Sequence, residues 1–259
     1  MDTVVLQQFR ALRARGAIFC DFDGTLSEIV HTPSAARPWP GARETLAALA
    51  STYAVVAVVS GRSARELVEW LGRDLEIWGV HGAEMARDGE VELTDVAAKY
   101  LPLMQRVIAE ARDRVDQLDI PGVLVEDKRV MAGLHFRAAT DIEKARLLLD
   151  GIAADLAARY GLTRAGGRLA FELRPPVEFS KKQVVLDRAA EMDVAAATFI
   201  GDDKVDLPAF DALDELALRD IITWRVAVAS DEAPPELIAR ADEVVDGPSG
   251  AIAFLRELL

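Results

Sequence analysis

The sequence predicts an α/β fold: a doubly wound, mostly parallel sheet with a smaller α+β domain inserted into it. Strand and helix patterns alternate with short links in the first and last thirds of the chain, whereas the middle follows a different order. One segment, 54–59, is the continuous apolar run Ala-Val-Val-Ala-Val-Val. Such a run is typical of a strand buried on both faces of a parallel sheet. Sheets of this class bind ligands at the carboxyl ends of their strands.

The outer segments of the chain supply the elements of this sheet in order. Pro40 and Gly41 open the first helix, which places Leu46 and Leu49 on one apolar face. The expected strands are 17–20, 54–59, 77–80, 198–200 and 225–228. The expected helices are 40–52, 64–71, 184–191, 206–216, 236–240 and 251–258.

The middle of the chain has a helix–hairpin–helix–hairpin pattern, which is typical of an α+β domain. Its expected elements are a helix over 95–118, strands over 123–127 and 131–136, a helix over 141–160, and strands over 162–165 and 169–173. We expect hinges near Thr94 and near Pro175-Pro176. The predicted domains are therefore a core of 1–94 and 175–259, and an inserted cap domain of 95–174.

Composition limits the classes of protein to consider. The 259 residues suffice for a sizeable core, and no apolar run approaches the roughly 20 residues of a membrane helix. The net charge of −13, without a basic stripe, argues against a nucleic-acid partner. The single cysteine, Cys20, excludes a disulfide framework and a cysteine zinc site. We expect a cytoplasmic protein without a membrane partner, and a monomer is compatible with the sequence, which does not fix the oligomeric state.

The most informative stretch is 18–26, an apolar strand followed by Asp21, Asp23, Gly24 and Thr25. Strand alternation would point the two acids the same way and Phe22 into the core. Neighbouring carboxylates repel each other and favour a cation, for which Mg²⁺ is the natural candidate. Glycine permits a sharp turn, and the threonine hydroxyl can hold a phosphate oxygen. A nucleophilic aspartate followed two residues later by an acid/base aspartate suits phosphoryl transfer, although a solvated strand end would look similar.

Two further clusters follow at a strand end and at a helix start. Ser60 and Gly61 end the buried strand 54–59, where a hydroxyl and the N–H groups of the next helix favour an anion. Alone, this motif is equally compatible with an N-cap and a turn. Lys181 and Lys182 open a helix after the second hinge, and one of them could neutralise phosphate charge. The register favours Lys181, and Lys182 stays an alternative.

The fourth cluster, 200–206, follows the expected strand 198–200. Asp202 comes directly after this strand and could ligate a metal shared with Asp21. Asp203 and Asp206 could support the metal site from outside its ligands, Asp206 by bracing the lysine or a metal-bound water. Four clusters in this order, all at the same edge of one sheet, are far more specific than any one of them.

This set of motifs resembles the haloacid dehalogenase superfamily of phosphohydrolases, whose four motifs occur in the same order. It is most similar to the trehalose-6-phosphate phosphatases, and the similarity spans 19–210, cap included. That family has Asp-x-Asp-Gly-Thr-Leu-x-x-Ile-Val followed by a proline, matched by 21–30 and Pro33. The other shared motifs are Ser-Gly-Arg at 60–62, Gly-x-His-Gly-x-Glu at 79–84, Glu-x-Lys at 126–128, a segment like His-Tyr-Arg at 135–137, and Glu-Leu-Arg-Pro at 172–175.

The resemblance implies a Mg²⁺-dependent phosphatase that hydrolyses trehalose 6-phosphate through an aspartyl-phosphate, on a haloacid dehalogenase-like core. Asp21 would be the nucleophile, Asp23 the acid/base and Lys181 the charge-neutralising residue. The metal would be held by Asp21, Asp202 and the backbone carbonyl of Asp23. Phosphate-binding residues would be Thr25, Ser60 and Gly61. Substrate-binding residues would be Arg62, His81, Glu126, Lys128, Glu172 and Arg174.

Several alternatives stay open at this stage. A related sugar-phosphate phosphatase, acting on sucrose phosphate or mannosyl-glycerate phosphate, would keep the core motifs and change the cap. A phosphomutase or a silent sugar-phosphate sensor is less favoured. Val205 and Leu207 replace the family's threonine and glutamate, which affects the expected substrate preference. In the cap, alternating charges on an exposed strand would also explain Glu126 and Lys128, and packing would explain His135.

Overall fold

The computed structural model describes residues 3–30, 35–167, 169–230 and 233–259, so Pro33 lies outside the described residues. The chain forms two compact units, one of Met1–Glu92 with Phe179–Leu259 and one of Leu93–Glu178. We call them the core unit and the inserted unit. Their limits fall at 92/93 and 178/179, whereas the sequence placed the hinges near Thr94 and near the two prolines.

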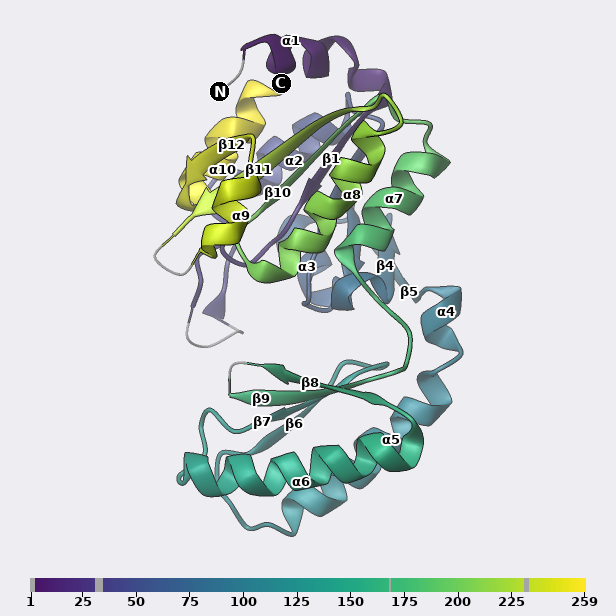
Figure 1. Ribbon diagram of the computed structural model, residues 1–259, viewed down its shortest axis with the longest axis vertical. Helices are drawn as coiled ribbons and strands as arrows, with labels where there is room; N and C mark the ends of the chain where they lie inside the picture. The colour runs from purple at the N-terminus through teal and green to yellow at the C-terminus, as the bar shows by residue number, and fades with distance from the viewer. Residues whose placement is uncertain (1–2, 31–34, 168, 231–232) are drawn as a thin grey trace. The chain divides into compact units, whose positions relative to one another are not determined.

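Within the described residues, the main sheet has eight strands in the order β12-β11-β10-β1-β2-β3-β4-β5 (Figure 1). Pairing is parallel from β12 to β3 and antiparallel between β3 and β4, which confirms the predicted mostly parallel sheet. The strands are β1 (Gly16–Cys20), β2 (Val55–Val59), β3 (Glu76–Gly79), β4 (Glu84–Arg87), β5 (Glu90–Leu93), β10 (Ala196–Gly201), β11 (Ile222–Ala229) and β12 (Glu243–Asp246).

Helices cover both faces of this sheet, as a doubly wound fold requires. Alternation in β1 divides the core: Ile18 and Cys20 pack in one apolar cluster, Ala17 and Phe19 in the other. The first cluster includes residues of α1 (Thr3–Ala11), α2 (Ala42–Ala50), α3 (Ala64–Leu71) and α10 (Gly247–Glu257). The second includes residues of α7 (Lys181–Glu191), α8 (Leu207–Ala217) and α9 (Pro235–Arg240).

Four elements of the core were not predicted: α1, β4, β5 and β12. The strands among them lie toward the two edges of the sheet, where a strand needs no continuous apolar run. In β12 the burial alternates between half-buried and exposed positions, and the sequence is Glu-Val-Val-Asp. Asp88 and Gly89, both with positive φ, form the turn between β4 and β5.

The inserted unit is an antiparallel sheet with helices packed on one face. The expected helix over 95–118 is divided into α4 (Asp95–Ala98) and α5 (Leu101–Asp116), because Pro102 cannot continue a helix from the preceding turn. The sheet order is β6-β7-β9-β8. The other elements are β6 (Leu124–Asp127), β7 (Ala132–His135), α6 (Ile142–Tyr160), β8 (Thr163–Gly167) and β9 (Ala170–Arg174).

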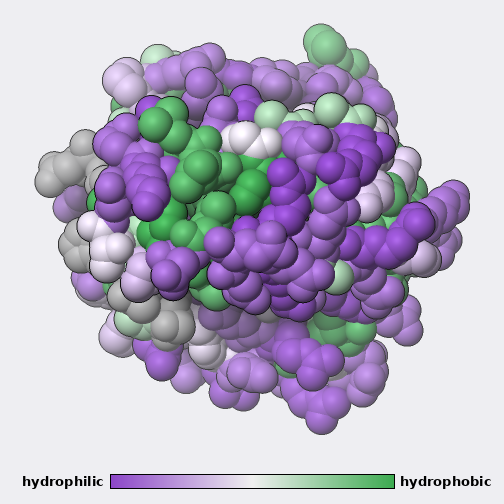
Figure 2. All heavy atoms as spheres, turned by 90° about the horizontal axis from the view of Figure 1, so that it is seen from below, coloured by the Kyte–Doolittle hydropathy of each residue, from purple (hydrophilic) through white to green (hydrophobic). Residues whose placement is uncertain are grey.

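Apolar side chains of α5 and α6 form one core with those of β6, β7 and β9. The view from below shows a largely hydrophilic face with one large apolar area and several smaller ones (Figure 2). Among the helices that the structure describes, none combines the length and the apolar character needed to cross a membrane.

Candidate active site

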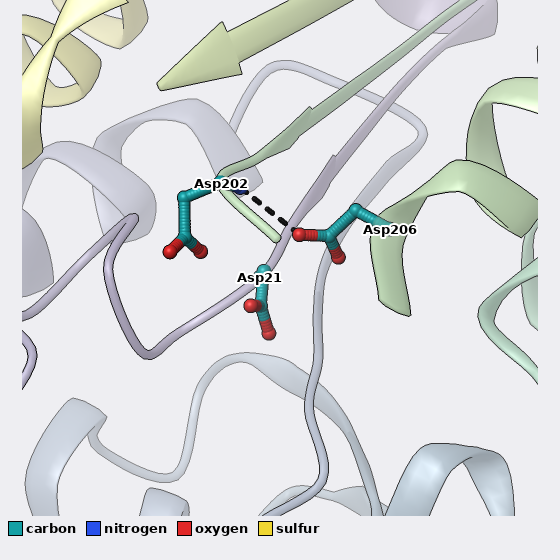
Figure 3. A group of neighbouring side chains, drawn as sticks. All are labelled: Asp21, Asp202 and Asp206. Atoms are coloured by element: carbon teal, nitrogen blue, oxygen red, sulfur yellow. Dashed lines mark hydrogen bonds between the residues drawn. The ribbon is translucent and has the colours of Figure 1, made fainter. Parts of the chain in front are cut away.

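Three buried carboxylates meet at the carboxyl ends of two neighbouring strands. Asp21 follows β1, and Asp202 follows β10; these strands pair in parallel with Cys20 opposite Ile200, so their ends coincide. Asp206 ends the 3₁₀ turn that leads into α8. One carboxylate oxygen from each residue lies within 4.8 Å of the others (Figure 3). The three residues are 5%, 4% and 0% exposed, so water solvates these charges poorly.

Lys181 supplies the positive charge of this cluster. It is the first residue of α7, whose N-cap Ser180 accepts a hydrogen bond from the N–H of Gln183. The Lys181 Nζ atom lies 2.6 Å from Asp21 Oδ1 and 2.6 Å from Asp206 Oδ1. Lys182 instead pairs with Glu215 at 2.5 Å, on a partly exposed side. The structure therefore brings Lys181, and not its neighbour, to the acids.

Asp206 holds this arrangement together through both of its oxygens. Oδ1 accepts the hydrogen bond from Lys181, and Oδ2 accepts the N–H groups of Asp202 (2.9 Å) and Asp203 (3.0 Å). A Cβ atom at Gly201 would lie 2.4 Å from Asp206 Cγ, so only glycine fits there. The Asp203 carboxylate is exposed, and its Oδ1 accepts the N–H of Lys204.

Burial and mutual repulsion shift the proton affinities of these groups. Burial raises the pKa of Asp21 to about 7, although the Lys181 charge opposes this shift. Burial and the charge of Asp21 raise the pKa of Asp202 to about 9. Burial alone would lower the pKa of Lys181, but Asp206 and Asp21 outweigh it and raise it. The cluster contains three carboxylates and one ammonium, so a bound cation would neutralise its excess negative charge. Its oxygen atoms are the ligands that Mg²⁺ prefers.

Gly24 and Thr25 fit closely against Asp202. Gly24 has φ +79, and a Cβ atom there would lie 1.9 Å from Asp202 Oδ2. The Thr25 hydroxyl, fully buried, donates to Asp202 Oδ1 at 3.3 Å. The turn predicted from the sequence therefore needs glycine for two reasons, its left-handed backbone and its contact with this carboxylate.

The Asp23 carboxylate contacts Arg62 rather than the acidic cluster. Arg62 Nε and Nη2 donate to its two oxygens at 2.7 and 2.8 Å, a bidentate pair. The guanidinium also contacts Glu66 at 3.1 Å and lies over the Trp70 ring, 5.0 Å from its centroid. Because β1 ends at Cys20, strand alternation does not extend to this acid, and Asp21 and Asp23 reach different partners.

The loop of Ser60 and Gly61 is held by the segment 79–84, mainly through His81. Ser60 is buried, and its Oγ accepts the N–H of Arg62 at 3.2 Å. The N–H of His81 donates to the Ser60 carbonyl at 2.8 Å. The His81 ring packs closely against Gly61, where a Cβ atom would lie 2.9 Å from His81 Cε1. His81 has φ 58 and the preceding Val80 φ 49, an uncommon conformation for a β-branched residue.

Sequence reasoning assigned no role to Glu84, the last residue of that segment. It is buried, and its Oε2 accepts the N–H of Ala64, the first residue of α3, at 2.9 Å. A negative charge at a helix start is favourable. The sequence contained the residue, but the contact depends on strand β4, which was not predicted.

In the inserted unit, the predicted substrate residues gather on one side of the sheet. Lys128 Nζ lies 3.2 Å from Glu172 Oε1 and 3.6 Å from Glu126 Oε2. Arg174 Nε donates to Glu172 Oε2 at 3.0 Å. His135, which sequence reasoning set aside as packing, lies 2.8 Å from Glu126. Arg62 and His81 belong to the core unit.

Comparison with known proteins gives a consistent family. The trehalose-phosphatase family model matches residues 19–235. A trehalose-phosphate phosphatase of Mycobacterium leprae (strain TN) is 38% identical over 210 residues, which is 76% of this chain and 47% of the relative. One of Mycolicibacterium paratuberculosis is 36% identical over 254 residues, 93% of this chain and 61% of the relative. The chain thus spans about half the length of the curated relatives it matches.

Solved structures show the same fold at low sequence identity. A trehalose-6-phosphate phosphatase related protein has a TM-score of 0.74 at 23% identity, covering 93% of this chain and 95% of its own. The C-terminal domain of Candida albicans trehalose-6-phosphate phosphatase has a TM-score of 0.73 at 22% identity, covering 98% and 95%. A haloacid dehalogenase-like hydrolase from Bacteroides thetaiotaomicron has a TM-score of 0.63 at 14% identity, covering 94% and 99%.

Proposed function

The chain belongs to the trehalose-phosphatase family, and on that premise we propose that it hydrolyses trehalose 6-phosphate to trehalose and phosphate. The observation that carries the proposal is the buried cluster of Asp21, Asp202, Asp206 and Lys181 at the strand ends. Such a cluster combines a nucleophile, a cation site and a fixed ammonium, which phosphomonoester hydrolysis requires.

In the proposed first step, Asp21 forms a bond to phosphorus while the bond from phosphorus to the sugar oxygen breaks. Asp23 gives its proton to that oxygen, so trehalose leaves as a neutral alcohol. In the second step, Asp23 takes a proton from water, the water oxygen bonds to phosphorus, and Asp21 is released with phosphate. Both Asp23 oxygens accept hydrogen bonds from Arg62, which orients the ionised carboxylate as the base of the second step; to carry the proton of the first step, one of its oxygens would have to leave Arg62.

Charge stabilisation would come from fixed groups around the phosphoryl oxygens. Lys181 is already oriented by two carboxylates, so its ammonium needs no reorganisation during the reaction. Thr25, Ser60 and Gly61 would contact the remaining oxygens. Asp21, Asp202 and the Asp23 carbonyl would hold Mg²⁺, which when bound would supply positive charge to stabilise the phosphoryl oxygens. Asp206, whose oxygens hold Lys181 and two backbone N–H groups, would support these ligands, with Asp203 beside it.

We assign sugar recognition mainly to the inserted unit, as a cap domain for substrate specificity. Glu126, Lys128, Glu172 and Arg174 offer charged partners for hydroxyl groups, which make the stronger hydrogen bonds. Arg62 and His81 are weaker candidates, since the first is bound to two carboxylates and the second packs against Gly61.

The test is phosphate release from trehalose 6-phosphate, sucrose 6-phosphate and glucose 6-phosphate, with Mg²⁺ and with EDTA. We expect EDTA-sensitive release with a strong preference for trehalose 6-phosphate. Asp21→Asn should abolish release, whereas the matched control Asp193→Asn, an exposed aspartate, should not. Preference for another sugar would overturn the substrate, and wild-type activity in Asp21→Asn would overturn the mechanism.

A further inference from the structure

The polar face of the inserted sheet has its two glutamates in register. Strand pairing places Gly133 of β7 opposite Glu126 of β6 on one side and opposite Glu172 of β9 on the other. Residues in register point to the same face of a sheet, so the two glutamates lie on either side of this glycine. Leu134 of β7, next along the strand, packs in the apolar core on the opposite face.

The space above Gly133 is where His135 and Glu126 meet. The Nε2 atom of His135 lies 2.8 Å from Glu126 Oε2. Because an ionised carboxylate only accepts hydrogen bonds, the histidine nitrogen donates here. A Cβ atom at position 133 would lie 2.7 Å from His135 Nε2 and 3.2 Å from Glu126 Oε2. Glycine at position 133 therefore leaves the room in which this contact forms, and a larger residue would displace it.

The same contact belongs to a balanced chain of charges. Lys128 lies between Glu126 and Glu172, and Arg174 donates to Glu172 from the far end. Foremost through its hydrogen bond with His135, the pKa of Glu126 is lowered, so this half-exposed side chain stays an ionised acceptor. Within the described residues, its contacts with His135 and Lys128 both fall on Oε2. These two contacts fix the orientation of the Glu126 carboxylate, and with it the direction of Oε1.

We propose that His135 is a positioning residue for sugar recognition: it fixes the Glu126 carboxylate so that a hydroxyl of trehalose donates to it. The inference rests on the proposed function, in which Glu126 contacts the sugar. His135 itself need not touch the substrate, and it takes no part in phosphoryl transfer. Packing alone does not explain the residue, because it lies on the polar face and is about one third exposed.

A double-mutant cycle tests whether His135 acts through Glu126. Steady-state kinetics would be measured on trehalose 6-phosphate and on p-nitrophenyl phosphate, which has no sugar. We expect His135→Ala to raise KM for the sugar phosphate about tenfold with little change in kcat, the scale of one hydrogen bond to a charged group. His135→Gln, which keeps a donor near the Nε2 position, should recover most of this loss. The double variant His135→Ala/Glu126→Ala should be no worse than Glu126→Ala.

Gly133→Ala is a second variant that keeps both side chains but pushes them apart. Its methyl group meets the end of the His135 ring, so the ring must move, and we expect about a fivefold rise in KM for trehalose 6-phosphate. Gly166→Ala in β8 of the same sheet is the matched control, since no atom lies within 4 Å of a Cβ atom there. This control should keep the wild-type KM.

The outcomes separate this inference from the proposed function. If the wild-type protein releases no phosphate from trehalose 6-phosphate, the proposed function fails and the inference fails with it. If the wild type is active but His135→Ala keeps its KM, only the inference is overturned. Equal losses on both substrates, or additive losses in the double variant, would also overturn it, because His135 would then act on folding or independently of Glu126.

Discussion

Without divalent cations, the free energy of unfolding should fall as the pH rises from about 6 to about 9. In the metal-free protein the pKa of Asp21 is raised from 3.8 to about 7 and that of Asp202 from 3.8 to about 9, by burial first in both cases. The folded state therefore holds protons that the unfolded chain, with carboxyl pKa values near 3.8, has already released. The free energy of unfolding must then fall as pH rises through this window.

The structure sets the scale of this effect. Between pH 6 and pH 9 the folded protein keeps the Asp202 proton over about three pH units, which costs about 4 kcal/mol at about 1.4 kcal/mol per unit, whereas Asp21 contributes only from pH 6 to about 7. The charge of Asp21 is itself one cause of the Asp202 shift, so the two contributions do not simply add. We expect a loss on the order of 4 kcal/mol between pH 6 and pH 9. At about 2–4 °C per kcal/mol, this lowers the melting temperature by roughly 10 °C.

The assay is thermal unfolding followed by circular dichroism at pH 6, 7, 8 and 9, in EDTA and in excess Mg²⁺. Because bound Mg²⁺ neutralises the ionised carboxylates, the gain in melting temperature on adding it should grow with pH. Asp202→Asn should flatten the pH dependence measured in EDTA, and Asp193→Asn, which changes an exposed aspartate, should leave it intact. A melting temperature in EDTA that stays constant or rises from pH 6 to pH 9 would refute the reasoning.

Three further predictions concern the core unit. Gly24→Ala should lower kcat about 100-fold, because its methyl group would meet the Asp202 carboxylate at 1.9 Å and the left-handed backbone would be strained; normal kcat with normal Mg²⁺ affinity would contradict this. Lys181→Ala should abolish phosphate release while Lys182→Ala, which breaks a partly exposed ion pair with Glu215, keeps it; the reverse ranking would exchange their roles. Arg62→Ala should slow the hydrolysis of trehalose 6-phosphate at least tenfold more than the hydrolysis of p-nitrophenyl phosphate, because the p-nitrophenolate leaving group needs no proton. Equal slowing of both reactions would show that Arg62 has no part in proton transfer.

Sequence patterns predicted the centre of the core sheet well and its edges poorly. Runs such as β2, in which all five residues are buried, can be recognised because both faces are apolar. β4, β5 and β12 lie toward the sheet edges and contain charged residues, so their pairing depends on neighbours that the sequence does not name. The break between α4 and α5 was readable from Pro102 but was outweighed by a long amphipathic pattern.

The candidate site divides in the same way. Asp21, Lys181 and Asp202 could be grouped in advance, because parallel strands bring the residues after their carboxyl ends to one edge. Pairs between side chains could not be predicted. Asp23 contacts Arg62, which is 39 residues later in the chain, and Glu126 contacts His135 across a hairpin. Both contacts depend on strand register and on side-chain rotamers.

The pairing of β1 with β10 has a consequence for the order in which the chain can fold. The ribosome releases Asp21 about 160 residues before Lys181, and the whole inserted unit is made between them. That unit is one continuous segment with its own apolar core, so it can form while the core sheet still lacks its central neighbour for β1. Until α7 and β10 emerge, the nascent chain exposes the unpaired backbone edge of β1 and the Asp21 carboxylate without the Lys181 ammonium. The acidic cluster is therefore assembled late in synthesis, and a chain stopped within the inserted unit would contain Asp21 without Lys181 and Asp202.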